Sequence, residues 1–349
     1  MSAEERLITI RQNKFGKYAN PWDSWREKRV KAAFYLISNK PTKEVWPPTN
    51  NPQLDINLPV CKPIFGPPFE DENSGIRLTW LGHATVLIHI DGVNILCDPI
   101  FSPRCALIGP RRYRPVPCII DELPLIDAVA ISHNHFDHMD VPTIRLIAKR
   151  FPNIKWCIPM GCAGTIASEI RVFHDKLPRI WEALWWEERE ITKDVKLIYT
   201  PAQHWSGRNI FLDNNRSFWG SWTIVGPNHR GFFAGDTGYC NIFRDIGNRY
   251  GPFDIAAIPI GAYTPRELMS SQHVNPAEAV QIHKDIRTRH SVGIHWGTYY
   301  IGREPYMQPK SDLKAAVQEA GLTDEDFRTL FHGQSLCFQR EPNAELFVE

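Results

Sequence analysis

The sequence predicts an α/β protein with one large folded domain behind an irregular arm. Apolar runs of strand length alternate with helical stretches from residue 76 onward. The 349 residues, 43% of them hydrophobic, can bury a large core. We therefore expect residues 1–75 to form an N-terminal extension and residues 76–349 to form one domain. Alternation of strands and helices alone also allows an ordinary three-layer α/β fold.

The arm is rich in helix breakers and carries one expected helix. Prolines interrupt residues 41–42, 46–48 and 66–68. Before these prolines, residues 24–37 predict an amphipathic helix with Ser24 as the N-cap. Apolar residues fall near one face with basic residues beside them: Trp25, Ala33, Phe34 and Ile37, with Arg26, Lys28, Arg29 and Lys31. This pattern suits an anionic membrane surface and equally suits a helix packed on its own domain.

The remaining elements follow in order from residue 76. Asp91-Gly92 indicates a hairpin turn, and Asn275-Pro276 is typical of an N-cap followed by proline at the first helical position. The strands expected are 77–80, 84–90, 93–97, 126–131, 195–200, 231–234, 255–262 and 291–294. The helices expected are 141–149, 164–169, 241–248, 276–287 and 311–320.

A dense group of metal-ligand side chains follows the apolar run 126–131. Residues 132–138 read SHNHFDH, with His133, His135, Asp137 and His138 at a strand end. Imidazole and carboxylate bind borderline metals such as zinc and iron, and alternating residues of extended backbone face the same side. Two metals need more ligands than this loop supplies, so we expect others at later strand ends.

Three later strands each end in one ligand-type residue followed by small or turn residues. The run 195–200 is followed by His204, the run 231–234 by Asp236, and the run 291–294 by His295. Gly235 and Gly238 beside Asp236 allow close backbone approach to an ion. A carboxylate has two oxygens, which suits Asp236 to a bridging position. As a series, these residues predict a metal centre.

Several of these segments resemble the ordered motifs of the metallo-β-lactamase superfamily. Longer stretches resemble one branch, the N-acylphosphatidylethanolamine-hydrolysing phospholipase D enzymes, from about residue 20 to about residue 333. The superfamily motifs include TWLGHAT at 79–85. The stretches that match the branch are DPIFS at 98–102, GPRR at 109–112, ELP at 122–124, QHW at 203–205, WGSW at 219–222, FAGDTGY at 233–239 and IPIGAY at 258–263.

The resemblance implies an αββα sandwich, in which two mixed β-sheets are flanked by helices, and a site for two zinc ions per chain. His133, His135 and His204 would hold one ion, and Asp137, His138 and His295 would hold the other. Asp236 would bridge the two ions. Asp98 would accept a ring N–H from a ligand histidine and fix its tautomer; as a carboxylate before Pro99 it could equally be a turn residue. Histidine and aspartate ligands also suit iron or manganese.

The implied reaction is metal-assisted hydrolysis. Two ions about 3.5–4 Å apart activate a bridging water and clamp the oxygens of a phosphoryl or acyl centre. In the branch named above, a metal-bridging hydroxide attacks the phosphorus of an N-acylphosphatidylethanolamine, releasing an N-acylethanolamine and leaving phosphatidic acid. The resemblance assigns catalytic roles to Asp236 and His273, and substrate contacts to Phe136, Gln272 and His273.

Two of these positions carry alternatives. The family has tyrosine more commonly at Phe136, and the missing hydroxyl removes one hydrogen bond, worth about 0.5–1.5 kcal/mol. His273 could equally be a polar residue that precedes the helix beginning at Pro276. The loop 109–114, with three arginines, could meet a phosphate or an anionic membrane, or it could be a solvated basic loop.

Two other functions remain compatible with the sequence. A dinuclear hydrolase of the same fold could act on a lactone, a thioester or another phosphodiester. A non-catalytic metal- or lipid-binding protein is less favoured because no ligand position is missing. A net charge of +1 supplies no strong field for nucleic acid.

Composition also bears on location and partners. The chain shows no signal-peptide pattern and no apolar run of about 18 residues, which predicts no membrane span. Eight cysteines without C-x-x-C spacing indicate reduced thiols. We therefore expect an intracellular protein, peripheral on the cytosolic face of internal membranes, that acts on a membrane phospholipid. The resemblance suggests a homodimer. It also points to a bile-acid site, but Gly207 and Phe211 replace the family's lysine and methionine, which disfavours such regulation.

Overall fold

The computed structural model describes residues 16–39, 42–43, 45–66, 75–106, 109–171, 179–209 and 213–338. Within them, two seven-stranded mixed sheets pack face to face, with helices outside. This confirms the expected αββα sandwich and excludes the three-layer alternative. The first sheet has the order β14 (Ser335–Phe338), β1 (Ile76–Gly82), β2 (Thr85–Ile90), β3 (Val93–Cys97), β4 (Ala128–Ala130), β5 (Lys155–Pro159) and β6 (Arg179–Ala183).

The second sheet runs in the order β13 (Phe327–Thr329), β12 (Thr288–Ile294), β11 (Phe253–Pro259), β10 (Arg230–Phe233), β9 (Ser221–Val225), β8 (Lys196–Thr200) and β7 (Glu188–Glu190). Strands β10, β11, β12 and β13 pair with one another in parallel, whereas β9 pairs antiparallel with β10 and with β8, and β8 pairs antiparallel with β7. Because β10, β11 and β12 run parallel, they end at the same edge of the sheet. The residues that follow these strands are therefore close together.

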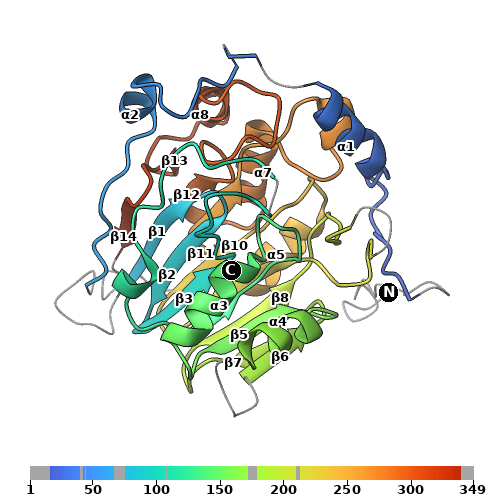
Figure 1. Cartoon of the computed structure of the whole chain (residues 1–349). Helices are drawn as coiled ribbons and strands as arrows, with labels where there is room; N and C mark the ends of the chain where they lie inside the picture. The colour runs from blue at the N-terminus through green and yellow to red at the C-terminus, as the bar shows by residue number, and fades with distance from the viewer. Residues whose placement is uncertain are drawn as a thin grey trace.

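Helices cover both outer faces. Figure 1 shows α3 (Val141–Arg150) and α4 (Ala163–Ile170), in green, on the first sheet. The second sheet is covered by α5 (Ile242–Tyr250), α7 (Pro276–Asp285) and α8 (Gln308–Glu319). Shorter helices are α1 (Arg29–Ser38), α2 (Gln53–Asn57), the 3₁₀-helix η2 (Ile120–Glu122) and α6 (Arg266–Met269). None of these described helices is long and apolar enough to cross a membrane.

Residue alternation in the first sheet fills two cores. Val86 and Ile88 of β2 point into the core between the sheets, while Leu87 points into the core beneath α3 and α4. Each face of the sheet is therefore buried, which explains why its strands are apolar almost throughout. At about 25 cal/mol per Å² of apolar surface, this two-sided burial is the main stabilising contribution to the sandwich.

The helix predicted over residues 24–37 begins later than expected. It starts at Arg29, and Ser24 does not cap it, because the Ser24 hydroxyl hydrogen-bonds to the side chain of Gln203 instead. Asn20 Nδ2 donates to the backbone oxygen of His204 at 2.6 Å, and Ser271 Oγ donates to that of Arg26 at 2.8 Å. The segment before α1 thus lies against the loops around residues 203 and 271.

Two other expectations concern thiols and the bile-acid site. All eight cysteines are free thiols, as expected. Of the two positions related to bile-acid binding, Gly207 is described and Phe211 lies outside the described residues.

Candidate metal centre

The residues predicted as metal ligands lie together at one edge of the sandwich. Each comes from a loop directly after a strand: β4, β8, β10 or β12. They form overlapping clusters of ligand-type atoms, each cluster lying within 4.8 Å. The predicted ligands among their members are His133, His135, Asp137, His138, His204, Asp236 and His295.

One half of the centre contains three imidazoles. His133 Nε2 lies 2.8 Å from His135 Nδ1, and His204 Nε2 lies 3.3 Å from the same atom. His133 and His204 are 1% exposed, so this group is enclosed by protein. Three converging ring nitrogens form the donor set that protein zinc sites commonly use.

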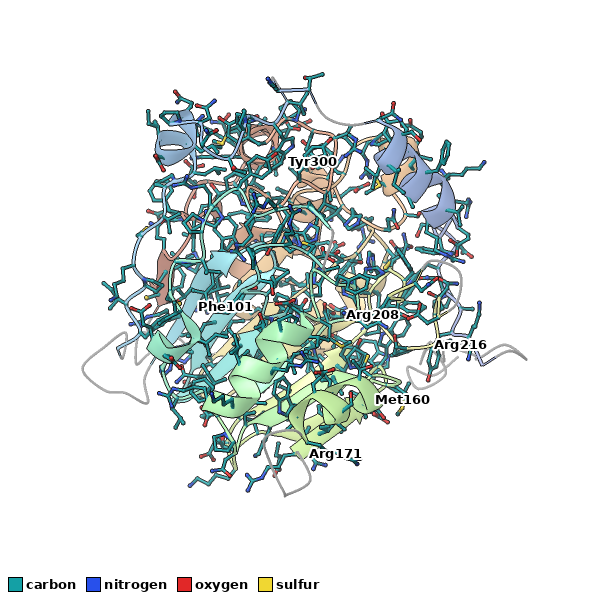
Figure 2. All side chains as sticks on the ribbon, viewed as in Figure 1. Phe101, Met160, Arg171, Arg208, Arg216 and Tyr300 are labelled. Atoms are coloured by element: carbon teal, nitrogen blue, oxygen red, sulfur yellow. The ribbon has the colours of Figure 1, made fainter. Side chains whose placement is uncertain are left out.

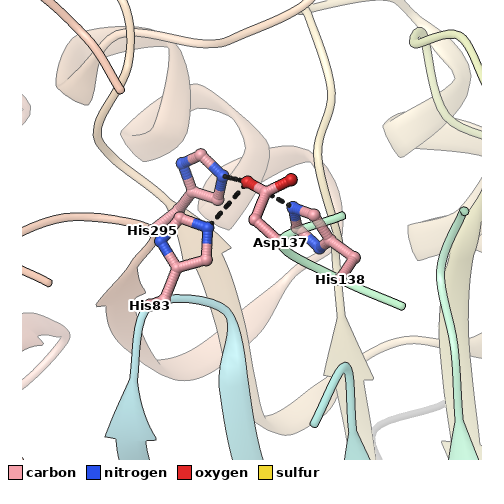
Figure 3. A group of neighbouring side chains, drawn as sticks. All are labelled: His83, Asp137, His138 and His295. Atoms are coloured by element: carbon pink, nitrogen blue, oxygen red, sulfur yellow. Dashed lines mark hydrogen bonds and ion pairs between the residues drawn. The ribbon is translucent and has the colours of Figure 1, made fainter. Parts of the chain in front are cut away.

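The other half gathers around two carboxylates. Asp137 Oδ2 lies 3.5 Å from both His138 Nε2 and His295 Nε2 (Figure 3). Asp236 reaches this half through two contacts, Oδ2 at 3.1 Å from His138 Nε2 and Oδ1 at 3.2 Å from His295 Nε2. Its Oδ2 also lies 3.8 Å from His204 Nε2 in the first half. Asp236 is therefore placed between the two groups.

The atoms of this cluster fit the metal ions that the fold implies. Among the described residues, His138 Nε2, His295 Nε2 and Asp236 Oδ1 are buried without a partner in hydrogen-bond geometry. Buried polar atoms without partners are costly and rare, and a coordinated cation would satisfy all three. The nitrogen and oxygen donors suit zinc, iron or manganese.

Neighbouring groups orient the histidine rings. Asp98 Oδ2 lies 2.6 Å from His138 Nδ1 and accepts a hydrogen bond from Ser132 Oγ at 2.5 Å. Ser132 Oγ also lies 2.9 Å from His133 Nδ1. The backbone oxygen of Gln272 lies 2.8 Å from His204 Nδ1. In each case the contact engages one ring nitrogen and leaves Nε2 directed at the cluster.

The pKa values of the histidines differ between the two halves of the centre. Burial lowers the pKa of His133 well below its usual value and those of His135 and His204 to about 3, so these three rings are neutral at pH 7. Burial also acts to lower the pKa of His138, but the charges of Asp236, Asp137 and Asp98 outweigh it and raise that pKa well above the usual value. Metal ligation needs neutral imidazole, which the first half already provides.

Gly235 allows the end of β10 to approach the end of β4. Its φ is +60°, and a Cβ added there would lie 2.6 Å from Ser132 Cβ. A larger residue would therefore push Asp236 away from the loop that carries His133. The sequence predicted close approach of this backbone to an ion, and the neighbour that the structure places against Gly235 is the side chain of Ser132.

A cavity of about 160 Å³ opens onto the centre. His273 lines it, with a buried Nδ1 that has no hydrogen-bond partner and lies 3.8 Å from Asp236 Oδ2. Gln272 also lines it, and its Oε1 accepts a hydrogen bond from Trp205 Nε1 at 2.7 Å. Two of the three predicted substrate residues thus line the space where a substrate would meet the metal ligands.

Phe136, the third predicted substrate residue, lies outside this cavity. It is 37% exposed and is not among the described residues that line the cavity. The guanidinium of Arg208, labelled in Figure 2, stacks 4.0 Å from the centre of its ring. Arg208 Nη1 donates to the backbone oxygens of Asn134 and Met139. The aromatic ring therefore supports an arginine beside the ligand loop.

The sequence reasoning missed a role for His83. Its Nε2 lies 2.9 Å from Asp137 Oδ2, and it belongs to the same cluster as Asp137, His138 and His295. A signal was present, because His83 follows a strand-ending glycine within the TWLGHAT motif, in the same pattern as the predicted ligands.

The sequence suggested that the arginine loop 109–114 contacts a phosphate or membrane, or that it is solvated. Neither applies to its central residue, Arg112. Arg112 is 9% exposed and donates from Nη1 to the backbone oxygen of Ile100 at 2.9 Å. It therefore joins loops inside the protein and is not presented to phosphate or solvent. Arg114 Nη2 pairs with Asp55 Oδ1 at 2.6 Å.

Fold and site together define a metal-dependent hydrolase of the metallo-β-lactamase type. The family model described as "Beta-lactamase superfamily domain" matches residues 93–296. The chain is 38% identical over 340 residues to the N-acyl-phosphatidylethanolamine-hydrolyzing phospholipase D 1 of Caenorhabditis elegans, covering 95% of this chain and 94% of that protein. It is 30% identical to the mitochondrial enzyme of the same name from Saccharomyces cerevisiae, covering 93% of this chain and 76% of that one.

Solved structures agree on the fold. An isothiocyanate hydrolase from Delia radicum gut bacteria superposes with a TM-score of 0.59 at 18% identity, covering 76% of this chain and all of that one. A metallo hydrolase from Ignicoccus hospitalis gives a TM-score of 0.56 at 21% identity, covering 77% of this chain and all of that one. The chain belongs to the β-lactamase superfamily and, within it, to the family of N-acylphosphatidylethanolamine-hydrolysing phospholipases D. The expected enzyme class, a hydrolase, is confirmed.

Proposed function

We propose that this protein hydrolyses the phosphodiester of N-acylphosphatidylethanolamine with two zinc ions. The observation that carries the proposal is the grouping of all seven predicted ligands at one edge of the sandwich, with Asp236 between its halves. The relationship to the phospholipase D of C. elegans over 95% of the chain supports the substrate.

In this proposal each half of the centre holds one ion. His133, His135 and His204 would hold the first, and Asp137, His138 and His295 would hold the second, with Asp236 between the two groups. Bound ions would supply an activated water and positive charge for the phosphoryl oxygens. Water adds to phosphorus and the bond from phosphorus to the ethanolamine oxygen breaks. Phosphatidic acid keeps the phosphate, and the N-acylethanolamine leaves as an alcohol.

His273 is proposed to contact the reacting diester. His273 lines the cavity, and its buried Nδ1 has no hydrogen-bond partner among the described residues. Burial lowers the pKa of His273 to about 3, despite the opposing charge of Asp236. A neutral ring at this place can donate a hydrogen bond to a phosphoryl oxygen or to the leaving oxygen. Gln272 supports the same wall of the cavity through Trp205.

We also propose peripheral contact with a membrane, because the substrate is a bilayer lipid. The outer side of α1 exposes three apolar residues in helical spacing: Val30 is 47%, Phe34 72% and Ile37 73% exposed. The inner side of the same helix lines the cavity at the metal centre. We assign this contact to the cytosolic face of internal membranes, with α1 as the element that meets lipid.

The test is an assay of the purified chain loaded with zinc. We expect release of N-acylethanolamine, measured by mass spectrometry, and loss of that release in Asp236→Asn and His133→Ala. His89→Gln is the matched control, because His89 contacts Asn94 on the neighbouring strand, away from the ligand loops. Intact turnover by either ligand variant would refute the assignment. Turnover of a lactone or thioester without cleavage of the diester would select the alternative hydrolase.

A further inference from the structure

Arg29 places a guanidinium group at the cavity of the metal centre. It is the first residue of α1, and it lines the same space as His135, Asp236 and His273. Its side chain is 16% exposed. Its Nε is buried and has no hydrogen-bond partner among the described residues. A buried donor without a partner is costly and rare, and the same side chain lines the cavity, which indicates a ligand with acceptor oxygens there.

Two contacts hold the guanidinium in place. Arg29 Nη1 pairs with Glu27 Oε2 at 2.5 Å, and Arg29 Cζ lies 6.0 Å from the centre of the Trp205 ring. The Trp205 ring in turn packs against the His135 ring, with 4.1 Å between centres. The position of the arginine is therefore coupled to a ligand loop through one aromatic ring.

The helix that carries Arg29 has one face directed at the cavity. Residues Arg29, Ala32, Ala33 and Leu36 line it and are spaced as one side of a helix. Ala32 packs in a small cluster with Ala262 and Met269. Lys28 Nζ donates to the backbone oxygen of Glu267 at 2.5 Å. These contacts attach α1 to α6 and fix which of its sides faces the centre.

We propose that Arg29 binds the anionic phosphate of the substrate diester, opposite the metal ligands. This rests on the proposed function. A guanidinium presents paired donors that match two phosphoryl oxygens, and its charge is independent of metal loading. No lysine and no other arginine is among the described residues that line the cavity.

The size of the cavity makes this contact selective. About 160 Å³ is well below the roughly 300–1,000 Å³ of pockets that enclose a whole drug-sized ligand. The phosphodiester and its adjoining carbons fit inside, and the acyl chains lie outside along α1. A neutral lactone or thioester gains nothing from Arg29, so this residue favours an anionic diester over neutral esters.

The experiment compares Arg29→Gln and Arg29→Lys with the wild type, using zinc-loaded protein. The substrate is a short-chain, soluble N-acylphosphatidylethanolamine, and calorimetry measures the Kd of dihexanoyl phosphatidic acid. For Arg29→Gln we expect KM and Kd to rise roughly 10- to 100-fold with a smaller change in kcat. Arg29→Lys should recover part of the loss, because it keeps the charge and loses the paired geometry.

Arg289→Gln is the matched control. Arg289 pairs with Asp254 near the start of β12, about 20 Å along the strand direction from His295. KM and Kd should be unchanged in this variant. Each protein is first checked for equal metal content and melting temperature. If Arg29→Gln fails this check, the test rests on Arg29→Lys. A KM and a Kd of Arg29→Lys that both equal the wild-type values would then overturn the proposal, because paired recognition requires the guanidinium.

The outcomes separate this inference from the proposed function. A wild type that cleaves the diester, with Arg29→Gln inside twofold of its KM and Kd, overturns the role of Arg29 alone. A wild type that does not cleave the diester overturns the proposed function, and the phosphatidic acid series then still measures whether Arg29 binds phosphate. A fall in kcat with unchanged KM and Kd would also contradict phosphate binding.

Discussion

His83 Nε2, in the turn between β1 and β2, lies 2.9 Å from Oδ2 of Asp137, which belongs to the loop after β4. The two side chains are 2% and 17% exposed. Burial and the nearby His295 lower the pKa of His83 to about 3, so the ring is neutral and its Nε2–H can donate to the carboxylate. The hairpin turn after β1 thereby fixes the oxygen that Asp137 presents to His138 and His295.

Replacing His83 should weaken metal binding without removing a proposed ligand. In His83→Gln we expect the affinity of the half that contains Asp137 to fall roughly 10- to 100-fold, which is typical when a hydrogen bond to a ligand is lost. Competition with a chromophoric chelator measures the two affinities. His89→Gln serves as control, and equal affinities in all three proteins would show that His83 does not orient Asp137.

Removing metal should lower stability, because ions that bind only the folded chain stabilise it. An ion present at 1,000 times its Kd contributes about 4 kcal/mol. Elemental analysis should find two ions per chain before treatment with a chelator, and calorimetry should then show a lower Tm that zinc restores. Fewer than one ion per chain in carefully prepared protein would favour a non-enzymatic role. An unchanged Tm after verified metal loss would contradict stabilisation by the ions.

Acid should destabilise the fold partly through His283 on α7. This side chain is 5% exposed, its Nδ1 lies 2.9 Å from Ser291 Oγ, and burial lowers its pKa to about 4, outweighing the charge of Asp326. The folded state then binds fewer protons than the unfolded state, whose histidine titrates near 6.5. The contribution to stability is complete above pH 6.5 and is lost as the pH falls toward 4.

Between pH 7 and pH 5 this amounts to about 2 kcal/mol. Urea unfolding of the wild type and His283→Gln should therefore show the wild type losing that much more stability over this range. Parallel curves for the wild type and His283→Gln would contradict the prediction.

The exposed side of α1 should decide membrane binding. Phe34→Ser with Ile37→Ser should weaken partitioning onto anionic vesicles at least about tenfold, since burying each side chain contributes about 1.5–3 kcal/mol. The Tm should not change, because the two side chains are 72% and 73% exposed. Vesicle sedimentation measures the partitioning.

A matched control replaces two equally exposed residues outside α1. Ile56 and Leu125 are 72% and 73% exposed, and Ile56→Ser with Leu125→Ser should bind vesicles like the wild type. An equal loss in both double variants would indicate general hydrophobic adsorption and not docking through α1.

Local sequence was sufficient for the strands that deliver the ligands. The runs before His133, His204, Asp236 and His295 are apolar because their strands are buried, and each ends where the backbone reaches the sheet edge. Strands β5, β6, β7, β9, β13 and β14 were not predicted. Their segments mix charged or polar residues with apolar ones, and they become strands by pairing with neighbours distant in sequence.

Ser24 and Arg112 show where local reasoning fails. Ser24 has the residue type of an N-cap, yet a hydrogen bond to Gln203, 179 positions away, removes it from the helix. Arg112 has the setting of a surface loop, yet it donates to carbonyl oxygens inside the protein. Both outcomes depend on partners that only folding brings near.

By itself the sequence determined the buried strands and the ligand-type residues at their ends, and its motifs resemble those of the family that has the sandwich fold. Strand periodicity and ligands at strand ends are local properties, so they can be read along the chain. The tertiary structure decided which residues surround that centre. Arg29 lies 104 positions before His133, and His83 lies 54 before Asp137. Their roles depend on how α1 and the first hairpin pack against the ligand loops, and long-range packing leaves no periodic pattern in the sequence.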